Sequence, residues 1–319
     1  MQILVTGGAG FIGSTLSDKL LKNGVKVLVL DNFNDFYDVN LKRQNVEPNL
    51  KNPDYKLYEG DICDKDLLTK IFSENKIDKV VHLAASAGVR PSIEKPLEYV
   101  NTNIYGTVNL LECMKLFDVK KIIFASSSSV YGNCSAEKFS EDLKISEPIS
   151  PYAATKSACE QFLYTYYKLY GISAVCLRFF TVYGPRQRPD LAIKNFTDLM
   201  LKGEPLSVYG DGNSLRDYTY IDDIISGVCS AIEYNKTDYE IINLGGGNPI
   251  TVKQVISTLE KVLNKTAVIN YLPFQKGDVN KTVSDITKAK NLLGYCPETN
   301  FEEGIKKFVE WTMKRKGNL

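Results

Sequence analysis

The chain has 319 residues, of which 44% are hydrophobic and 24% charged, and its formal net charge is +1. This balance of charge argues against nucleic acid or an anionic membrane as a partner, and no apolar run approaches the ~20 residues of a membrane span. The N-terminus lacks the basic and apolar regions of a signal peptide, so we expect a cytoplasmic protein.

The cysteines and the histidine exclude several kinds of site. The seven cysteines form no Cys-x-x-Cys pair, which favours reduced, mostly structural thiols. His82 is the single histidine, so a multi-histidine zinc site or a Ser-His-Asp triad would have to use it. It lies in the run 80–85, and we interpret it as a packed side chain at the end of a buried strand. We therefore expect no metal site.

A strand, a glycine-rich turn, a helix and a second strand open the chain. They are expected at residues 1–6, 7–13, 14–23 and 25–30. The turn has the pattern Gly-x-x-Gly-x-x-Gly, with glycines at Gly7, Gly10 and Gly13. Glycines permit a tight turn and let backbone N–H groups approach a pyrophosphate at a helix N-terminus. These features arrive in the order that a dinucleotide site requires.

An acidic residue, Asp31, follows the second strand. Its carboxylate can accept hydrogen bonds from the adenosine ribose hydroxyls and would repel a 2′-phosphate. No arginine or lysine follows it closely. The sequence therefore predicts NAD as the cofactor in preference to NADP.

Strands and helices continue to alternate after a polar, irregular segment at 32–54. Strands are expected at 55–59, 79–83, 121–126, 173–180 and 241–244, and helices at 65–74, 96–116 and 152–170. This alternation predicts an α/β fold, a Rossmann-type doubly wound parallel sheet covered by helices on both faces. Asp61, after the strand at 55–59, could accept a hydrogen bond from the adenine amino group; it could also cap the following helix, and the two roles are compatible.

Four serines, at 126–129, follow the strand expected at 121–126, where an open α/β sheet presents its ligands. Their hydroxyl groups can donate to and accept from a substrate hydroxyl. A polar turn without a ligand would have the same composition, so the run alone does not decide between the two roles.

Tyr152 and Lys156 are four residues apart, which places both side chains on one face of the helix expected at 152–170. Ser150 is placed to cap this helix, and Pro151 suits its first turn. An ammonium beside a phenol favours the phenolate, so we expect the pKa of Tyr152 to fall and the residue to act as a base. The alternative is a solvated helix face with no chemical role.

Motifs over nearly the whole chain resemble those of the extended short-chain dehydrogenases/reductases. They are the glycine pattern, Asp61-Ile62, the run 82–85, the serine run through Gly132, Tyr152-x-x-x-Lys156, and the segments 177–185, 216–223 and 277–278. Within this superfamily the chain is similar to the NAD-dependent nucleotide-sugar epimerases and dehydratases. The segments 87–90, 181–190 and 275–279 are most similar to UDP-glucuronate 4-epimerases, although Ser86 and Pro91 depart from that pattern.

This resemblance implies a cofactor lobe and a smaller substrate lobe. The NAD lobe would comprise residues 1–180 plus about 217–245, and the C-terminal α/β lobe, which binds the nucleotide sugar, would comprise 181–216 plus 246–319. The resemblance also implies a homodimer formed through two long helices of each subunit, near 102–116 and 152–170.

The resemblance assigns roles to individual residues. Ser127, Tyr152 and Lys156 would be catalytic. Cofactor contacts are expected at Gly7, Gly10, Phe11, Ile12, Gly13, Asp31, Asn32, Asp61, Ile62, Leu83, Ala84, Ala85, Tyr152 and Lys156. Substrate contacts are expected at Arg90, Ser127, Ser128, Ser129, Thr181, Arg188, Val208, Tyr209, Arg216 and Asp278.

The implied reaction is the epimerisation of a UDP-sugar at C4 through a 4-keto intermediate, with UDP-glucuronate as the expected substrate. Tyr152 would take the proton of the 4-hydroxyl, Ser127 would relay it, and Lys156 would hold the nicotinamide ribose. Arg90 and Arg188 suit a sugar carboxylate, because guanidinium binds carboxylate with two parallel hydrogen bonds. The same arginines could instead hold the diphosphate.

Other reactions of the superfamily need different residues. The 4,6-dehydratases have Asp and Glu where this chain has Ser128 and Ser129, and the UDP-glucuronate decarboxylases have Glu in place of Ser129; both activities are disfavoured here. UDP-glucose and UDP-N-acetylglucosamine 4-epimerases share many of the motifs and stay open as alternatives. A non-catalytic NAD-sensing protein would be expected to lack the Tyr-Lys pair or the serine.

Overall fold

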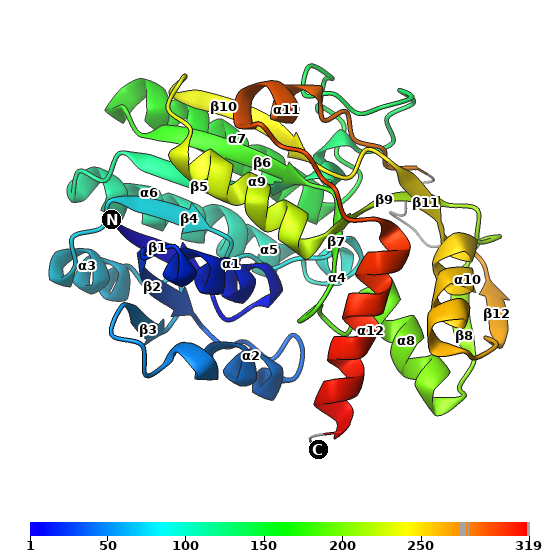
Figure 1. Ribbon diagram of the computed structural model, residues 1–319. Coiled ribbons are helices and arrows are strands. Elements are labelled where there is room, and N and C mark those ends of the chain that lie inside the picture. The colour runs from blue at the N-terminus through cyan, green and yellow to red at the C-terminus, as the bar shows by residue number, and fades with distance from the viewer. Residues whose placement is uncertain (275–278, 280, 318–319) are drawn as a thin grey trace.

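Seven parallel strands form the main sheet of the computed structural model, which describes residues 1–274, 279 and 281–317 (Figure 1). The strands are β1 (Gln2–Thr6), β2 (Lys26–Asp31), β3 (Tyr55–Glu59), β4 (Lys79–His82), β5 (Lys121–Ser127), β6 (Ser173–Phe179) and β10 (Tyr239–Leu244). Their order is β10-β6-β5-β4-β1-β2-β3, and every neighbouring pair is parallel. The strand order reverses between β1 and β4, which confirms the predicted doubly wound sheet.

Helices cover both faces of this sheet because successive strand residues point to opposite sides. The helices α1 (Phe11–Lys22) and α9 (Ile221–Glu233) cover one face, and α3 (Lys65–Glu74), α6 (Gly106–Leu116) and α7 (Pro151–Tyr170) cover the other. In β1, Ile3 and Val5 pack in the hydrophobic cluster on the α1 side, whereas Leu4 packs in the cluster on the α7 side. The uninterrupted apolar runs of the strands therefore suit burial on both faces.

Shorter helices connect these layers. They are α2 (Val39–Val46), the 3₁₀ turn η1 (Glu47–Asn49), α4 (Val89–Glu94), α5 (Pro96–Tyr99), the π-helical segment η2 (Val100–Tyr105) and the 3₁₀ turn η3 (Ser128–Tyr131). The single helix expected at 96–116 is thus α5, η2 and α6 in succession. None of the helices in the described part of the chain combines the length and apolar character that crossing a bilayer would need.

A smaller group of elements lies at the other end of the molecule, beside the carboxyl ends of the main strands (Figure 1). The strands β7 (Thr181–Tyr183), β9 (Leu215–Tyr220) and β11 (Pro249–Thr251) form one sheet, and β8 (Leu206–Tyr209) pairs with β12 (Ile269–Leu272). The helices of this region are α8 (Ala192–Lys202), α10 (Val252–Leu263) and α12 (Phe301–Gly317), whereas α11 (Thr287–Leu293) packs beside β10 and α9.

The chain passes back to the main sheet before it ends. β10 pairs with β6 along Tyr239–Leu244, so the strand expected at 241–244 does join that sheet. The segment that follows β10 is held by Asp217 on β9. The buried carboxylate of Asp217 accepts hydrogen bonds from the backbone N–H groups of Gly246, Gly247 and Ser284, at 2.7, 3.1 and 2.9 Å. The wider division of the chain into two interleaved lobes stays a prediction.

Candidate active site

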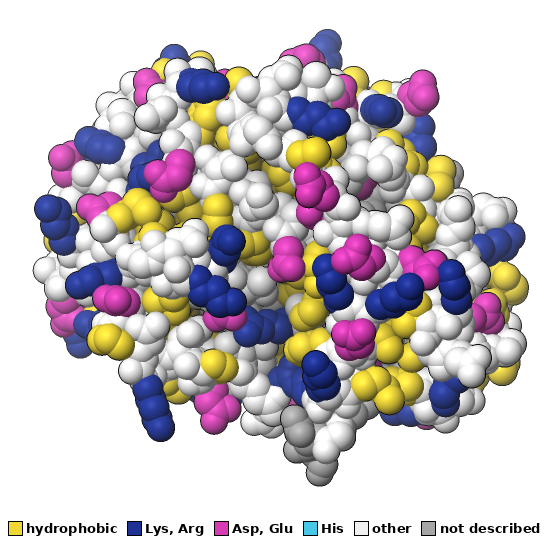
Figure 2. Space-filling view, viewed as in Figure 1, with side chains coloured by type: hydrophobic (Ala, Val, Ile, Leu, Met, Phe, Trp, Pro, Cys, Tyr) yellow, Lys and Arg dark blue, Asp and Glu magenta, His cyan; other side chains and the backbone are white. Residues whose placement is uncertain are grey.

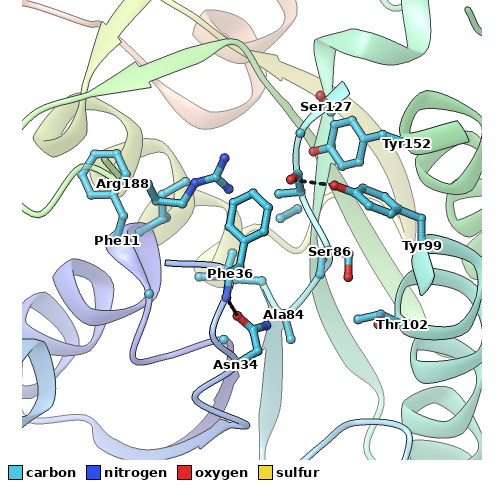
Figure 3. Close-up of a pocket in the computed structure, with 18 of the residues that line it drawn as sticks. Phe11, Asn34, Phe36, Ala84, Ser86, Tyr99, Thr102, Ser127, Tyr152 and Arg188 are labelled. Atoms are coloured by element: carbon cyan, nitrogen blue, oxygen red, sulfur yellow. Dashed lines mark hydrogen bonds between the residues drawn. The ribbon is translucent and has the colours of Figure 1, made fainter. Parts of the chain in front are cut away.

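A cavity of about 750 Å³ opens at the carboxyl ends of the main strands. Its wall is formed by the glycine turn, the segments after β2 and β4, the serine run, the start of α7, and the segment 179–191. Figure 3 shows Ser127, Tyr152 and Tyr99 on one side of it and Phe11 and Arg188 on the other. All the residues for which a cofactor contact was predicted line this cavity.

Two positions of the glycine turn, Gly7 and Gly13, have no room for a side chain. Gly7 has φ +70, and its N–H donates to the carbonyl of Leu30 at 2.7 Å. A Cβ at Gly13 would lie 2.2 Å from the carbonyl oxygen of Gly7, well inside the van der Waals distance. Helix α1 begins directly after the turn and has neither a side-chain cap at Gly10 nor an acidic residue in its first turn. Close backbone approach and an uncapped helix N-terminus fit a pyrophosphate group.

Two carboxylates, those of Asp31 after β2 and Asp61 after β3, lie in the cavity wall beyond the glycine turn. Asp31 is 7% exposed and accepts hydrogen bonds from the N–H groups of Ala9 and Phe33, at 3.0 and 2.9 Å. Asp61 accepts from Cys63 N–H and from the Asn32 amide, each at 2.8 Å. Burial opposes ionisation of Asp61, but these hydrogen bonds outweigh it and hold its pKa below the usual range.

Two details at this end differ from the sequence interpretation. The cap of α3 is Asp64, whose side chain accepts from Leu67 N–H at 2.9 Å, so the helix-cap role considered for Asp61 is wrong. A lysine also lies in the cavity wall, since Lys42 donates to the carbonyl and side-chain oxygens of Asn34 at 2.9 and 2.8 Å. Lys42 is eleven residues from Asp31 in the sequence, so a search for basic residues that closely follow Asp31 did not find it.

His82 is a structural residue behind the cavity, as predicted. It is 1% exposed, and burial and the Lys156 charge lower its pKa to about 3, so the ring is neutral. The Thr107 hydroxyl donates to the carbonyl of Asn103, so its oxygen accepts from His82 Nε2 at 2.9 Å, and the ring proton lies on Nε2. His82 Nδ1 therefore accepts from Thr6 Oγ1, at 2.6 Å. This chain of hydrogen bonds supports the segment after β4.

The serine run divides into two roles. The Ser126 hydroxyl donates to Glu160 Oε1 at 2.5 Å and is buried away from solvent. Ser127 caps the following 3₁₀ turn: its hydroxyl oxygen accepts from Ser129 N–H and its hydroxyl hydrogen faces Ser129 Oγ, both at 3.1 Å. All four serines border the cavity, and Ser127 also caps the turn, so this segment is both a polar turn and part of the cavity wall.

Tyr152 and Lys156 both line the cavity from the first turns of α7. Ser150 caps this helix by accepting from Ala153 N–H at 3.1 Å, as predicted. Lys156 is 3% exposed, its ammonium donates to the carbonyl of Ala125 at 2.7 Å, and burial lowers its pKa to about 8.

The predicted direction of the Tyr152 pKa is wrong. Burial raises this pKa, and the groups that oppose the rise are the Ser127 hydroxyl and the Arg188 charge. The Lys156 ammonium donates instead to a backbone carbonyl on β5. Periodicity placed the two side chains on one face of the helix, but it carries no information on how deeply a phenol is buried.

Arg188 is a fixed cation in the cavity wall. Its guanidinium donates to both carboxylate oxygens of Asp190, at 3.0 and 2.8 Å, and lies 5.3 Å from the centre of the Phe36 ring. Burial works against its charge, but Asp190 outweighs this and raises its pKa. Thr181 lines the same region, so the predicted substrate residues 127–129, 181 and 188 are brought together.

The remaining predicted substrate residues that the structure describes lie outside this cavity wall. Arg90 and Tyr209 meet, with the guanidinium 4.5 Å from the ring centre. Val208 is 2% exposed and belongs to the core, and Arg216 donates to the carbonyl of Leu215 at 2.9 Å. Asp278 lies outside the described residues. Roles for all of these stay predictions.

Two residues that sequence reasoning missed hold the segment after β4. The Tyr99 hydroxyl donates to the carbonyl of Ala87 at 2.9 Å, and its ring meets that of Tyr152 edge-on, with centres 6.1 Å apart (Figure 3). Asn103, in η2, accepts from Ser86 N–H at 2.8 Å and donates to Ser86 O and Thr155 Oγ1, both at 3.0 Å. Helical periodicity does not reveal a π-helical turn, so no local signal pointed to these contacts.

Similar proteins were identified by sequence. Residues 4–308 match the protein family described as GDP-mannose 4,6 dehydratase. A UDP-glucuronate 4-epimerase of Thermodesulfobacterium geofontis is 49% identical over 97% of this chain and 95% of its own length. UDP-glucuronate 4-epimerase 1 of Arabidopsis thaliana is 42% identical over 99% of this chain and 78% of its own length.

Solved structures give the same result. UDP-glucuronic acid 4-epimerase from Bacillus cereus, in complex with UDP-glucuronic acid and NAD, is 41% identical with a TM-score of 0.93, over 99% of this chain and 100% of that chain. UDP-glucose 4-epimerase with UDP-glucose from Thermotoga maritima is 38% identical with a TM-score of 0.91, over the same shares of the two chains. The chain therefore belongs to the GDP-mannose 4,6 dehydratase family of extended short-chain dehydrogenases/reductases.

Proposed function

We propose that this protein is an NAD-dependent UDP-sugar 4-epimerase that converts UDP-glucuronate to UDP-galacturonate. The observation that carries the proposal is one cavity in which Ser127, Tyr152 and Lys156 face a glycine turn shaped for a dinucleotide and the cation Arg188. The relatives named as UDP-glucuronate 4-epimerases support the choice of sugar. UDP-glucose is the second candidate, because a structural neighbour holds that nucleotide sugar.

NAD fits the cavity because the turn at Gly7 and Gly13 leaves no room for a Cβ, and because Asp31 is held at its far end by two backbone N–H groups. When bound, NAD would supply a nicotinamide ring that accepts a hydride and returns it. Lys156, held by the carbonyl of Ala125, is placed to donate to a ribose hydroxyl beside the reacting centre.

Proton transfer falls to Tyr152 and Ser127. Tyr152 would take the proton of the sugar 4-hydroxyl as a hydride leaves C4, and would give a proton back when the hydride returns to the opposite face of the 4-keto sugar. The Ser127 hydroxyl and the Arg188 charge favour the phenolate, and burial opposes it. Because Tyr152 would return the proton that it took, and the hydride would return to C4, in each turnover, the reaction needs no external acid or reductant.

A uronic acid brings a hazard, since a ketone at C4 lies β to the carboxyl carbon and invites loss of carbon dioxide. We propose that Thr181, Ser128 and Ser129 hold the carboxylate out of alignment with the carbonyl orbital. Ser128 and Ser129 also occupy the two positions at which the 4,6-dehydratases have the Asp and Glu that serve as acid and base. The intact Tyr152, Lys156 and Ser127 argue against a non-catalytic NAD-sensing protein.

Incubation with UDP-glucuronate, UDP-glucose and UDP-N-acetylglucosamine, each followed by NMR without added cofactor, tests the reaction and the sugar together. We expect UDP-galacturonate from the first and slow or absent conversion of the other two. Conversion of UDP-glucose alone would establish the alternative substrate, and no conversion of any of the three would overturn the proposal.

Arg188→Lys separates the two roles open to this arginine. Lysine keeps the positive charge that acts on Tyr152 but loses the two-pronged geometry. If Arg188 binds the sugar carboxylate, kcat/KM for UDP-glucuronate falls about 10–100-fold and that for UDP-glucose changes less than about 3-fold. Equal losses for both sugars would assign Arg188 to the diphosphate. Arg43→Lys is the control, since Arg43 also pairs with a carboxylate, Glu59, but lies outside the cavity wall.

We also propose a homodimer formed through α6 and α7. Large apolar side chains stay exposed along these helices and the segment before α6; they include Leu97, Tyr105, Leu116, Phe162 and Leu169. Covering them with a second copy would remove apolar area from water. Light scattering at micromolar concentration should give twice the 35.7 kDa of one chain; a mass of 35.7 kDa would contradict the dimer.

A cytoplasmic location and the absence of a nucleic-acid partner remain part of the proposal. The seven cysteines are all free thiols, which supports a cytoplasmic location, where thiols stay reduced. Basic and acidic side chains are interspersed over the face of the molecule in Figure 2, which does not favour binding of a polyanion such as nucleic acid there. The contacts of Val208, Tyr209 and Arg216 with UDP are also part of the proposal.

A further inference from the structure

A buried ion pair joins helix α7 to strand β6 behind the serine run. Arg178 donates two parallel hydrogen bonds to Glu160, from Nε to Oε1 at 2.9 Å and from Nη2 to Oε2 at 2.8 Å. Each side chain is 2% exposed, and neither is part of the cavity wall. Removing two charges from water is costly even with good geometry, so stability alone does not account for the pair.

The pair reaches the proposed catalytic serine through Ser126. Ser126 is the register partner of Arg178 on the adjacent strands, and its hydroxyl donates to Glu160 Oε1 at 2.5 Å. Two groups, Ser126 from β5 and Arg178 from β6, thus meet at one carboxylate on α7. Because Ser127 follows Ser126 directly, fixing the Ser126 side chain fixes the backbone from which Ser127 projects toward Tyr152 (Figure 3).

The pair also reaches Lys156. Glu160 follows Lys156 by one helical turn on the same face of α7. The Lys156 ammonium donates to the carbonyl of Ala125, and the Glu160 carboxylate accepts from Ser126, so α7 holds two consecutive residues of β5. A shift of this helix against the strand would move Ser127 and Lys156 together.

The charges around Lys156 come from α7, β4 and β6. Cys159 and Glu160 on α7 and Cys176 on β6 favour its charged form, but burial outweighs them. Burial raises the pKa of both thiols, so they carry no charge at neutral pH, and His82 on β4 is neutral as well. Within the described part of the chain, Glu160 is therefore the anion that acts on Lys156, with Arg178 behind it.

We propose that Glu160 and Arg178 are positioning residues: the pair fixes the end of β5, and with it the Ser127 hydroxyl, and Glu160 offsets the Arg178 charge beside the buried Lys156 ammonium. The kinetic consequences of this proposal rest on the proposed epimerase function. The effect on Lys156 does not, because its titration can be measured without turnover.

Titration of the Lys156 side chain by NMR tests the electrostatic half. The signal is assigned by its loss in Lys156→Met, and the pKa is compared in the parent, in Glu160→Gln and in Glu160→Gln/Arg178→Gln. Glu160→Gln removes the anion and leaves Arg178 unopposed, so the pKa of Lys156 should fall by about one unit or more. The double variant removes both charges and should return it to within about half a unit of the parent.

The outcomes separate this role from a structural one. A Lys156 pKa that does not move in Glu160→Gln, or that falls equally in the single and double variants, overturns the proposal that Glu160 offsets the Arg178 charge at Lys156. Glu240→Gln is the matched control, because Glu240 also forms an ion pair, with Lys288 at 2.6 Å, but lies on β10 outside the cavity wall. It should leave the Lys156 titration unchanged.

The kinetic half is read from kcat for the UDP-sugar over pH 6–9. In Glu160→Gln the alkaline limb of the profile should move to lower pH by the same amount as the Lys156 pKa, while KM changes little. Ser126→Ala should lower kcat about 10-fold without moving the limb, because it loosens Ser127 and leaves the charges in place. Equal kcat in Ser126→Ala and the parent overturns the positioning of Ser127.

Two variants keep the test decisive if Glu160→Gln does not fold. Arg178→Lys keeps both charges and loses the paired geometry, so it should lower kcat about 10-fold and leave the Lys156 pKa in place. If kcat is unchanged in both single variants, Arg178→Lys and Ser126→Ala, the positioning role of the pair is overturned. If the parent converts no UDP-sugar, the proposed function fails, but the Lys156 titration still decides the role of Glu160.

Discussion

Replacing Tyr152 with phenylalanine should lower kcat by about 10³-fold or more while UDP-sugar and NAD still bind. The substitution removes one hydroxyl and keeps the ring, which packs edge-on against Tyr99. A positioned acid–base group contributes about 10²–10⁴-fold to the rate, and among the described cavity residues Tyr152 is the phenol that both Ser127 and Arg188 favour in its ionised form. Conversion is measured by NMR and binding by calorimetry.

The matched control for this variant lies on the same helix. Tyr166→Phe also removes a phenol hydroxyl, one that donates to Glu112 Oε1 at 2.6 Å, but Tyr166 is not part of the cavity wall. It should keep kcat within about 2-fold and lose about 1 kcal/mol of unfolding free energy. A Tyr152→Phe enzyme that turns over within a few-fold of the parent would remove this residue from the role of base.

Gly13→Ala should abolish the tight retention of NAD. The new methyl group would lie 2.2 Å from the Gly7 carbonyl oxygen and 2.7 Å from Gly8 Cα, and both are backbone atoms that cannot move without opening the turn. We expect the affinity for NAD to fall at least about 100-fold and the free energy of unfolding to fall by about 2 kcal/mol. NAD is quantified in extracts of the purified protein, and its Kd is measured by calorimetry.

Gly24→Ala is the control for the glycine turn. Gly24 has φ +73 at the end of α1, and a Cβ there would meet nothing within 4 Å. The variant should therefore lose about 1 kcal/mol from backbone strain alone and keep its NAD content. If Gly13→Ala retains NAD like the parent, the turn does not cradle the dinucleotide in the way that we propose.

The parts of the site that local sequence could predict are those that depend on local backbone geometry. The glycine pattern, the strand before it and the helix after it require one another within a short segment, so their order predicted the cradle at Gly7 and Gly13. The four-residue spacing of Tyr152 and Lys156, with Ser150 and Pro151 before them, likewise predicted where α7 begins. Alternation of strands and helices predicted the parallel sheet.

Other features depend on segments that are distant in the sequence. The pKa of Tyr152 is raised because several elements bury it, and no spacing rule contains that information. Glu160 and Arg178 lie on different elements and meet only because β6 packs under α7. Asn103 forms hydrogen bonds with Ser86 and Thr155 from a π-helical turn, which helical periodicity in the sequence does not reveal.

The return of the chain to the main sheet at β10 has a consequence for synthesis. The strand β6 is complete by residue 179, but its outer neighbour begins only at Tyr239, after β7, β8 and β9 have been made. Until then β6 presents an unpaired edge, which can pair wrongly with another nascent chain. The main sheet therefore cannot be completed on the ribosome before β10 has been made.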